Sequence, residues 1–128
     1  MASRFQTLSR GRITTRGAMN KTESRYAELL TVQKMAGEIV EWWFEPFSLR
    51  LSSNVQGSEL KPARYTPDFL VLLPDGETHV VDVKGSGLDD FAGDVRLKMA
   101  AEKFTLWRFY KAKERRKRDG GGFVLSVC

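Results

Sequence analysis

The sequence contains very little cysteine and histidine. Cys128 is the only thiol and His79 the only imidazole among the 128 residues. A single thiol forms no internal disulfide, and one cysteine with one histidine supplies too few ligands for a zinc site. This composition suits the reducing environment of the cytoplasm, where we expect the protein to act.

Long apolar runs are also missing. Every apolar run is only a handful of residues long, whereas a membrane-spanning helix needs about 20. The basic N-terminal segment is not followed by the apolar stretch of a secretory signal. We therefore expect no membrane partner and no signal peptide. Motifs of a phosphate-binding loop, a dinucleotide-binding glycine turn or a Ser-His-Asp triad are absent as well.

Positive charge is concentrated at the two ends of the chain. Residues 1–22 carry a net charge of +5, residues 23–110 carry −4, and residues 111–128 carry +4. An acidic middle between basic ends is the pattern expected when carboxylates hold a metal ion and the ends bind phosphate. We interpret residues 1–19 as a flexible basic arm, with an organelle transit peptide as the alternative, and residues 20–128 as a single domain.

The sequence predicts helices alternating with strands. Asn20, with Glu23 three residues later, predicts a capped helix start, and Gly37 predicts its end. Residues 39–51 are β-prone, but Pro46 restricts that strand to a sheet edge or interrupts it. We expect a second helix from about residue 93 to residue 103, then strands at 104–112 and near the C-terminus. The basic residues 113–121 would join these two strands as a hairpin, unless a helix runs on through Arg116.

The segment YTPDFLVLLPDGETHVVDVK, residues 65–84, predicts a β-hairpin. Its Leu-Pro-Asp-Gly at residues 73–76 suits a type I turn, with proline second and glycine fourth. A hairpin centred on this turn pairs Leu70 with Val80. Because side chains alternate along a strand, one face carries the apolar residues that we expect in the core. These residues are Phe69, Val71, Val81 and Val83.

The same register places Asp68 opposite Asp82 on the other face, together with Lys84. Two like charges directly opposite on neighbouring strands repel each other and destabilise the pair. A divalent cation reverses this cost, because Mg²⁺ prefers oxygen ligands and uses one or two carboxylates. An ammonium group beside the cation helps to orient a nucleophile or stabilises charge that develops on phosphate. The pattern therefore predicts a magnesium-dependent site for phosphodiester hydrolysis.

Pro67-Asp68 followed by Asp82-Val83-Lys84 resembles the PD-(D/E)XK signature of the restriction-endonuclease-like nucleases. Over residues 20–103 the chain also resembles small phage nucleases, including the endonuclease I type that resolves branched DNA. The segments that carry this likeness are Lys21-Thr22-Glu23, Glu45-Pro46, Tyr65-Thr66-Pro67-Asp68-Phe69 and Asp82-Val83-Lys84-Gly85. One departure is Asp82, which stands where endonuclease I relatives often have the longer glutamate.

The resemblance implies an α/β fold with a restriction-endonuclease-like core, in which helices flank a central mixed sheet. It implies that Asp68, Asp82 and the carbonyl of Val83 bind Mg²⁺, with Mn²⁺ as a substitute. Lys84 would be the catalytic lysine. Glu23 would be a further catalytic and metal-binding acid, although its role in the helix cap competes with this one.

The resemblance further implies a DNA endonuclease, with a Holliday junction as the first choice of substrate, acting as a homodimer in the cytoplasm of a phage-infected bacterium. A phage nuclease that nicks or cuts duplex DNA is one alternative, and a DNA-binding protein of the same fold that does not cleave is another. An RNA-processing nuclease is a third. Basic residues would hold the DNA phosphates. They are Arg96, Lys98, Lys111, Lys113, Arg115, Arg116, Lys117 and Arg118.

Overall fold

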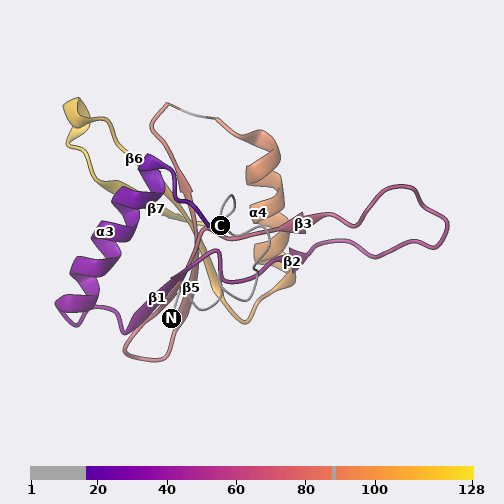
Figure 1. Ribbon diagram of the computed structural model, residues 1–128, viewed down its shortest axis with the longest axis horizontal. Coiled ribbons are helices and arrows are strands. Elements are labelled where there is room, and N and C mark those ends of the chain that lie inside the picture. The colour runs from indigo at the N-terminus through magenta and orange to yellow at the C-terminus, as the bar shows by residue number, and fades with distance from the viewer. Residues whose placement is uncertain (1–16, 88) are drawn as a thin grey trace.

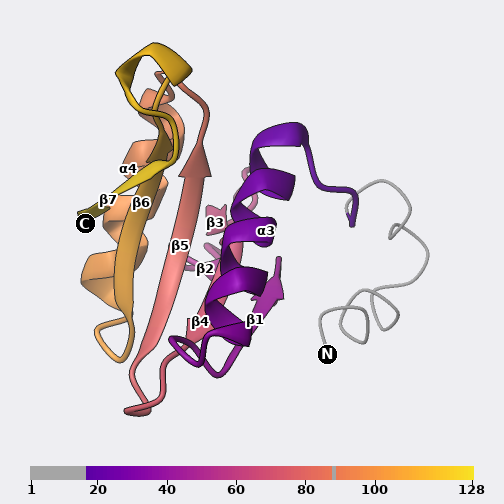
Figure 2. The same ribbon diagram turned by 90° about the vertical axis from the view of Figure 1, so that its left-hand side faces the viewer.

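The computed structural model describes residues 17–87 and 89–128, and it contains a mixed five-stranded sheet with one helix on each face (Figures 1 and 2). In chain order the elements are α3 (Lys21–Met35), β1 (Glu41–Phe44), β2 (Leu49–Arg50), β3 (Arg64–Tyr65), β4 (Phe69–Leu72), β5 (Thr78–Lys84), α4 (Phe91–Lys103), β6 (Arg108–Glu114), the 3-10 turn η2 (Lys117–Asp119) and β7 (Phe123–Val127). The sheet order is β1-β4-β5-β6-β7, and β2 and β3 form a separate two-stranded ribbon. Only β5 and β6 are parallel, because α4 carries the chain back between them. The expected α/β class, with a mixed sheet flanked by helices, is confirmed.

Helix α3 begins and ends where the sequence predicts. The side chain of Asn20 accepts a hydrogen bond from the backbone N–H of Glu23 at 2.7 Å, and Oε1 of Glu23 accepts one from the N–H of Asn20 at 2.9 Å. This reciprocal pair is a capping box, which satisfies two N–H groups at the helix start. Gly37, with φ of 79°, lies just beyond the helix end in the left-handed region that favours glycine.

The β4–β5 hairpin has the predicted register. Leu70 pairs with Val80, and the N–H of Leu73 donates to the carbonyl of Glu77 at 2.9 Å. Gly76 adopts a φ of 90°, as the turn requires. The last ladder pair is Phe69 with Val81, so the next residues outward on the two strands are Asp68 and Asp82.

Both faces of the sheet are covered, one by each helix (Figure 2). On the α3 side, the four expected core residues Phe69, Val71, Val81 and Val83 pack with Tyr26, Ala27, Leu30, Ile39, Phe44 and Ala112. On the α4 side, Val80 packs with Leu49, Leu51, Tyr65, Leu97, Ala100 and Phe109. The face that carries Asp82 is therefore a second core, and Asp82 itself is only 6% exposed.

The β-prone segment 39–51 does not form one strand. β1 ends at Phe44 and is an edge strand, as the proline predicted. Glu45 then adopts a φ of 44°, the only positive value at a non-glycine residue in the described ranges. The chain bends there and next enters β2, which pairs with β3 instead of the main sheet.

The later elements differ in detail from the prediction. β6 starts at Arg108 instead of residue 104, because the N–H groups of Phe104 and Trp107 bond to the carbonyls of Ala100 and Phe104 and form a turn. The alternative of a helix running through Arg116 is wrong, since residues 108–114 form a strand. The basic segment instead joins β6 and β7 as a hairpin that contains η2.

The basic arm, residues 1–19, lies outside the described residues apart from residues 17–19. Within the described ranges, neither helix has the length and apolar character to cross a membrane.

Candidate functional site

The candidate site lies at one end of the sheet. The C-terminal end of β5, the first turn of α3 and the first turn of α4 are at this end of the molecule (Figures 1 and 2). A salt bridge between Arg25 on α3 and Glu114, the last residue of β6, links these elements, with one N–O separation of 2.8 Å. Residues from distant parts of the sequence therefore lie at the same end of the sheet.

Asp68 lies just beyond the β4–β5 ladder, and its side chain is hydrogen-bonded to the backbone of β5. Its Oδ2 accepts a hydrogen bond from the backbone N–H of Val83 at 2.7 Å. Burial raises the pKa of Asp68 to about 8, and the charge of Asp82 adds to this shift, with a smaller contribution from Glu23. The hydrogen bond from Val83 opposes this shift but does not cancel it. The predicted repulsion between Asp68 and Asp82 is thus present in the folded chain.

Asp82 is buried, and only one of its two carboxylate oxygens accepts a hydrogen bond from a described residue. Its Oδ1 accepts a hydrogen bond from the hydroxyl of Tyr65 at 3.1 Å. Its Oδ2 lies 3.1 Å from Nζ of Lys84, but it accepts no hydrogen bond of good geometry from any described residue. Burial raises the pKa of Asp82, although Lys84 and Tyr65 act in the opposite direction. A buried carboxylate oxygen without a hydrogen bond is the feature expected where a cation binds.

Lys84 lies between two carboxylates. Its Nζ is 3.1 Å from Asp82 and 2.9 Å from Oδ2 of Asp90. Burial lowers the pKa of Lys84, but the hydrogen bond with Asp90 and the charge of Asp82 outweigh burial, and the net pKa is raised. The amine is therefore a fixed ammonium group at the edge of the Asp82 carboxylate.

Asp90 also caps α4 and connects the helix to Lys84. Its Oδ1 accepts a hydrogen bond from the N–H of Gly93 at 2.9 Å, while Oδ2 holds Lys84. A Cβ at position 93 would lie 2.1 Å from Oδ2 of Asp90 and 3.0 Å from Nζ of Lys84. Glycine is thus needed at this position for the helix cap and the ion pair to coexist.

Sequence reasoning did not assign roles to Tyr65 and Asp90. Tyr65 stood within the motif that resembles phage nucleases, but its bond to Asp82 comes from a separate ribbon. Asp90 carried a local signal, because aspartate directly before a helical segment is a favoured N-cap. Its contact with Lys84 depends on how the connection between β5 and α4 folds back, which the local pattern does not specify.

The donor set fits a magnesium ion better than a metal that needs many protein ligands. Among residues 17–87 and 89–128, no three His, Cys, Asp or Glu side chains converge as a metal-binding group. Glu23 takes part in the capping box and also lies near enough to Asp68 to raise the pKa of that carboxyl, so its metal-binding role stays a prediction. Mg²⁺ binds through one or two carboxylates and keeps several waters, which agrees with the Asp68–Asp82 pair. The Val83 carbonyl stays a predicted ligand.

The predicted phosphate-binding residues lie in β6, in α4 and in the β6–β7 hairpin. Lys111 pairs with Asp94 at 3.0 Å and lies beside Asp82 in the β5–β6 register. Lys113 lies beside Lys84 in the same register. Arg96 and Lys98 are on the exposed side of α4, where Lys98 lies 3.9 Å from Glu102.

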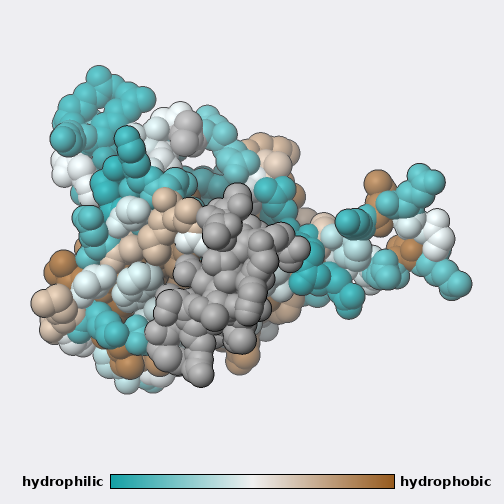
Figure 3. Space-filling view, in the orientation of Figure 1, coloured by the Kyte–Doolittle hydropathy of each residue, from teal (hydrophilic) through white to brown (hydrophobic). Residues whose placement is uncertain are grey.

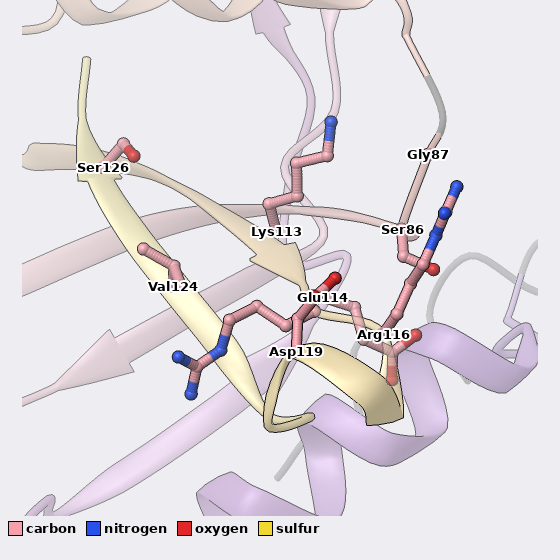
Figure 4. Close-up of a pocket in the computed structure, with 9 residues that line it drawn as sticks. Ser86, Gly87, Lys113, Glu114, Arg116, Asp119, Val124 and Ser126 are labelled. Atoms are coloured by element: carbon pink, nitrogen blue, oxygen red, sulfur yellow. The ribbon is translucent and has the colours of Figure 1, made fainter.

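The remaining basic residues, Arg115 to Arg118, are in the β6–β7 hairpin and are exposed. Arg115 and Arg116 line a pocket of about 460 Å³ together with Lys113, Ser86 and Gly87 (Figure 4). Nη2 of Arg116 lies only 2.9 Å from where a Cβ on Gly87 would be. The hairpin therefore contacts the loop that follows Lys84, and its charge lies next to the carboxylate site.

Comparison with known proteins identifies the family of the chain. Residues 11–116 match the model of a protein family whose description is "Protein of unknown function (DUF1064)". This match covers most of the chain, which therefore belongs to that family. Searches of curated proteins and of solved structures found no match.

Proposed function

We propose that the protein is an Mg²⁺-dependent DNA endonuclease with a restriction-endonuclease-like core. The observation that carries this proposal is the pairing of Asp68 with the buried Asp82 beside an ammonium group on the same strand. Two carboxylates with raised pKa values at one end of adjacent central strands cost stability unless a cation or proton neutralises them. Perturbed carboxylates beside a fixed lysine support a catalytic role for this site.

Each residue has a distinct part in this mechanism. Asp68 and Asp82 would bind Mg²⁺, which when bound supplies Lewis-acid stabilisation of a phosphodiester and lowers the pKa of water. Lys84 would orient the nucleophile and stabilise negative charge developing on the phosphate. Asp90 would keep the Lys84 side chain in place, since it lies 2.9 Å from the amine and is itself fixed by the cap of α4.

Branched DNA is the proposed substrate, as the resemblance to junction-resolving phage nucleases implies. Symmetric cutting of two strands favours a homodimer. The charge of the β6–β7 hairpin supports a polyanionic substrate, because its four consecutive basic residues are exposed beside the carboxylate site. The same resemblance supports a phage or prophage protein that acts in the bacterial cytoplasm.

A panel of DNA substrates tests the proposal. Four-way junction, flap, nicked and linear duplexes would be incubated with Mg²⁺, Mn²⁺ or EDTA and separated by electrophoresis. We expect cleavage of the junction with either metal, none with EDTA, and loss of cleavage in Asp82→Asn. Asp75→Asn is the matched control, because Asp75 is exposed in the hairpin turn at the other end of the same strands.

Two outcomes would favour the alternatives. Equal cleavage of the linear duplex would support a nicking or duplex-cutting nuclease with the same chemistry. Binding of DNA without cleavage under every metal condition would support a non-cleaving DNA-binding protein. Full activity of Asp82→Asn would show that the assigned site is wrong.

A further inference from the structure

A second basic surface lies where the β2–β3 ribbon meets the C-terminal end of α4 (Figure 1). None of its residues belongs to the Asp68–Asp82 site or to the predicted phosphate-binding set. A pocket of about 490 Å³ opens here, and we call it the ribbon pocket. Its lining residues are Ser48, Leu49, Arg50, Arg64, Lys103 and Phe104.

Two of the basic residues in the ribbon pocket repel each other. Arg50 is the direct cross-strand partner of Arg64 in the two-stranded ribbon, and both side chains are exposed. Like charges directly opposite on paired strands are destabilising. Among the described residues, no carboxylate forms an ion pair with Arg50, Arg64 or Lys103. An anionic ligand bound between them would relieve this repulsion.

The guanidinium of Arg64 is held ready for such a ligand. Its Nε donates to Oγ of Ser48 at 2.9 Å, and its Nη2 donates to the carbonyl of Ser48 at 3.1 Å. A guanidinium has five N–H donors, so these two bonds fix its plane and leave other donors for an anion. Arginine in a fixed orientation is well suited to phosphate oxygens.

One aromatic ring, that of Phe104, lines the ribbon pocket, and two more rings stack behind it. Phe104 lines the pocket and stacks on Trp107, with ring centroids 6.2 Å apart and planes 23° apart. Trp107 stacks in turn on Phe47, with centroids 5.1 Å apart. Phe104 is only half-buried, so it presents ring surface next to the arginines. Cations beside an aromatic ring are the elements that bind single-stranded nucleic acid, because every base has a face that stacks.

The ribbon pocket is also connected to the carboxylate site. Arg64 is followed by Tyr65, whose hydroxyl donates to Asp82. Three residues further along the chain is Asp68. Four residues of chain thus join the ribbon pocket, at the C-terminal end of α4, to the carboxylate site at the first turn of that helix. Beyond the pocket, the projecting loop between β2 and β3 is largely hydrophilic (Figure 3).

We propose that the ribbon pocket binds one nucleotide of an unpaired DNA strand. Arg50, Arg64 and Lys103 hold the phosphate, and Phe104 stacks on the base. A base within a duplex is already stacked and paired, so this pocket favours a substrate with a single-stranded segment. The inference rests on the proposed nucleic-acid substrate and deepens it, because it assigns the strand state that the enzyme recognises.

Binding measured without cleavage tests this proposal. The probes are a fluorescein-labelled oligo-dT strand, its 2-aminopurine derivative and a duplex of the same length, all in EDTA. Arg50→Glu places opposite charges across the ribbon, so it should preserve or raise the melting temperature. We expect it nonetheless to weaken binding of the oligonucleotide about tenfold or more, because it removes a cation that holds phosphate and adds repulsion.

Lys61→Glu is the matched control, because Lys61 lies in the same projecting segment, is exposed and does not line the pocket. It should weaken binding far less than Arg50→Glu. Phe104→Leu retains an apolar side chain of similar packing but removes the ring. We expect about a fivefold or larger loss of affinity, and loss of the 2-aminopurine quenching that reports base stacking.

The outcomes separate this proposal from the proposed function. Equal weakening by Arg50→Glu and Lys61→Glu would overturn it, because general electrostatic attraction would then explain the binding. Unchanged quenching in Phe104→Leu, or tighter binding of the duplex than of the single strand, would also overturn it. A parent protein that shows the expected differences but cleaves no DNA would support the pocket and refute the nuclease.

Discussion

The hydroxyl of Tyr65 donates a hydrogen bond to Oδ1 of Asp82 at 3.1 Å, across two separate β-structures. Tyr65 belongs to the short β2–β3 ribbon, whereas Asp82 is in the middle of the main sheet. Burial and the nearby charges of Asp82 and Asp68 raise the pKa of Tyr65 well above its usual value, so the hydroxyl remains protonated. The ribbon therefore supplies a permanent donor to the carboxylate.

Removing this donor should alter both stability and pH dependence. In Tyr65→Phe, Oδ1 of Asp82 loses its partner in a buried position, which costs about 1–3 kcal/mol of unfolding free energy. The pKa of Asp82 should rise, because the hydroxyl bond lowers it in the parent. The cleavage rate should consequently reach its plateau at higher pH, as measured by a pH–rate profile with Mg²⁺.

Tyr110→Phe is the control for this change, because Tyr110 is half-buried and packs against His79 away from both aspartates. It should leave the pH–rate profile in place. If Tyr65→Phe and the parent protein had the same profile, the hydroxyl would have no influence on the reactive form of Asp82.

Gly93→Ala should destabilise the protein although alanine is the better helix former. At an ordinary helix position this change would gain about 1 kcal/mol. Here the new Cβ would lie 2.1 Å from Oδ2 of Asp90, so the Asp90 side chain must shift, which weakens the cap of α4 and the Lys84 contact. The lost cap costs about 1 kcal/mol and cancels this gain. The weakened Lys84–Asp90 contact then makes the net change destabilising, as measured by urea unfolding.

The effect of Gly93→Ala on activity should also be visible, since displaced Asp90 no longer positions Lys84. Asp90→Asn separates the two roles. Asparagine caps helices as well as aspartate does, so stability should change little while the cleavage rate falls. A normal cleavage rate in Asp90→Asn would show that Lys84 needs no partner at Asp90.

Asp68 should make the metal-free protein less stable as the pH rises. The pKa of Asp68 is about 8 in the folded chain and about 3.9 in an unfolded one. Between these values the folded state binds more protons than the unfolded state, so the unfolding free energy falls from about pH 4 to about pH 8. In the parent protein the unfolding free energy should fall by about 1.4 kcal/mol for each pH unit between the two pKa values. Asp68→Asn should remove most of this pH dependence, as measured by thermal melts in EDTA.

Mg²⁺ should reverse the same destabilisation. At about pH 8, where the carboxyl of folded Asp68 is half ionised, Mg²⁺ should raise the melting temperature of the parent protein. The ion binds the folded carboxylates and replaces their repulsion with attraction. Asp68→Asn should respond much less. An equal response of the two proteins to Mg²⁺ would place the ion elsewhere.

The β6–β7 hairpin should determine the salt dependence of duplex binding. Replacing Arg116, Lys117 and Arg118 with glutamine removes exposed charge but keeps Arg115, whose Nε donates to the carbonyl of Gly121 at 2.8 Å. The slope of log affinity against log salt should decrease by about 0.9 for each DNA phosphate that the variant no longer neutralises. Arg108→Gln, at the other end of β6, is the control and should leave the slope unchanged.

Local chemistry made several features predictable from the sequence. The start of α3 follows from Asn20 and Glu23, which satisfy each other's backbone N–H groups within one turn. The register of the β4–β5 hairpin follows from the turn at Gly76 and from alternation along the strands. These two rules were sufficient to place Asp68 opposite Asp82, because all the residues involved lie within a short stretch of chain.

Other features depend on residues that are distant in the sequence. Pairing of β5 with β6 brings Lys113 beside Lys84. No local pattern specifies with which strand the chain pairs when it returns to the sheet after the crossover helix. The bend at Glu45 depends on β1 ending at the sheet edge while the chain moves to the ribbon. Trp107 belongs to a turn rather than a strand, since its aromatic neighbours pack on α4 and the ribbon.

The sequence by itself therefore determined the two acids, the lysine and the hairpin that holds them, since turn and strand preferences act over a few residues. Tertiary structure alone decided that Asp82 is buried on the α4 side, that Tyr65 bonds it and that Asp90 holds Lys84. The physical reason is that burial, and with it the shift of each pKa, arises only when helices and ribbon pack on both faces of the sheet.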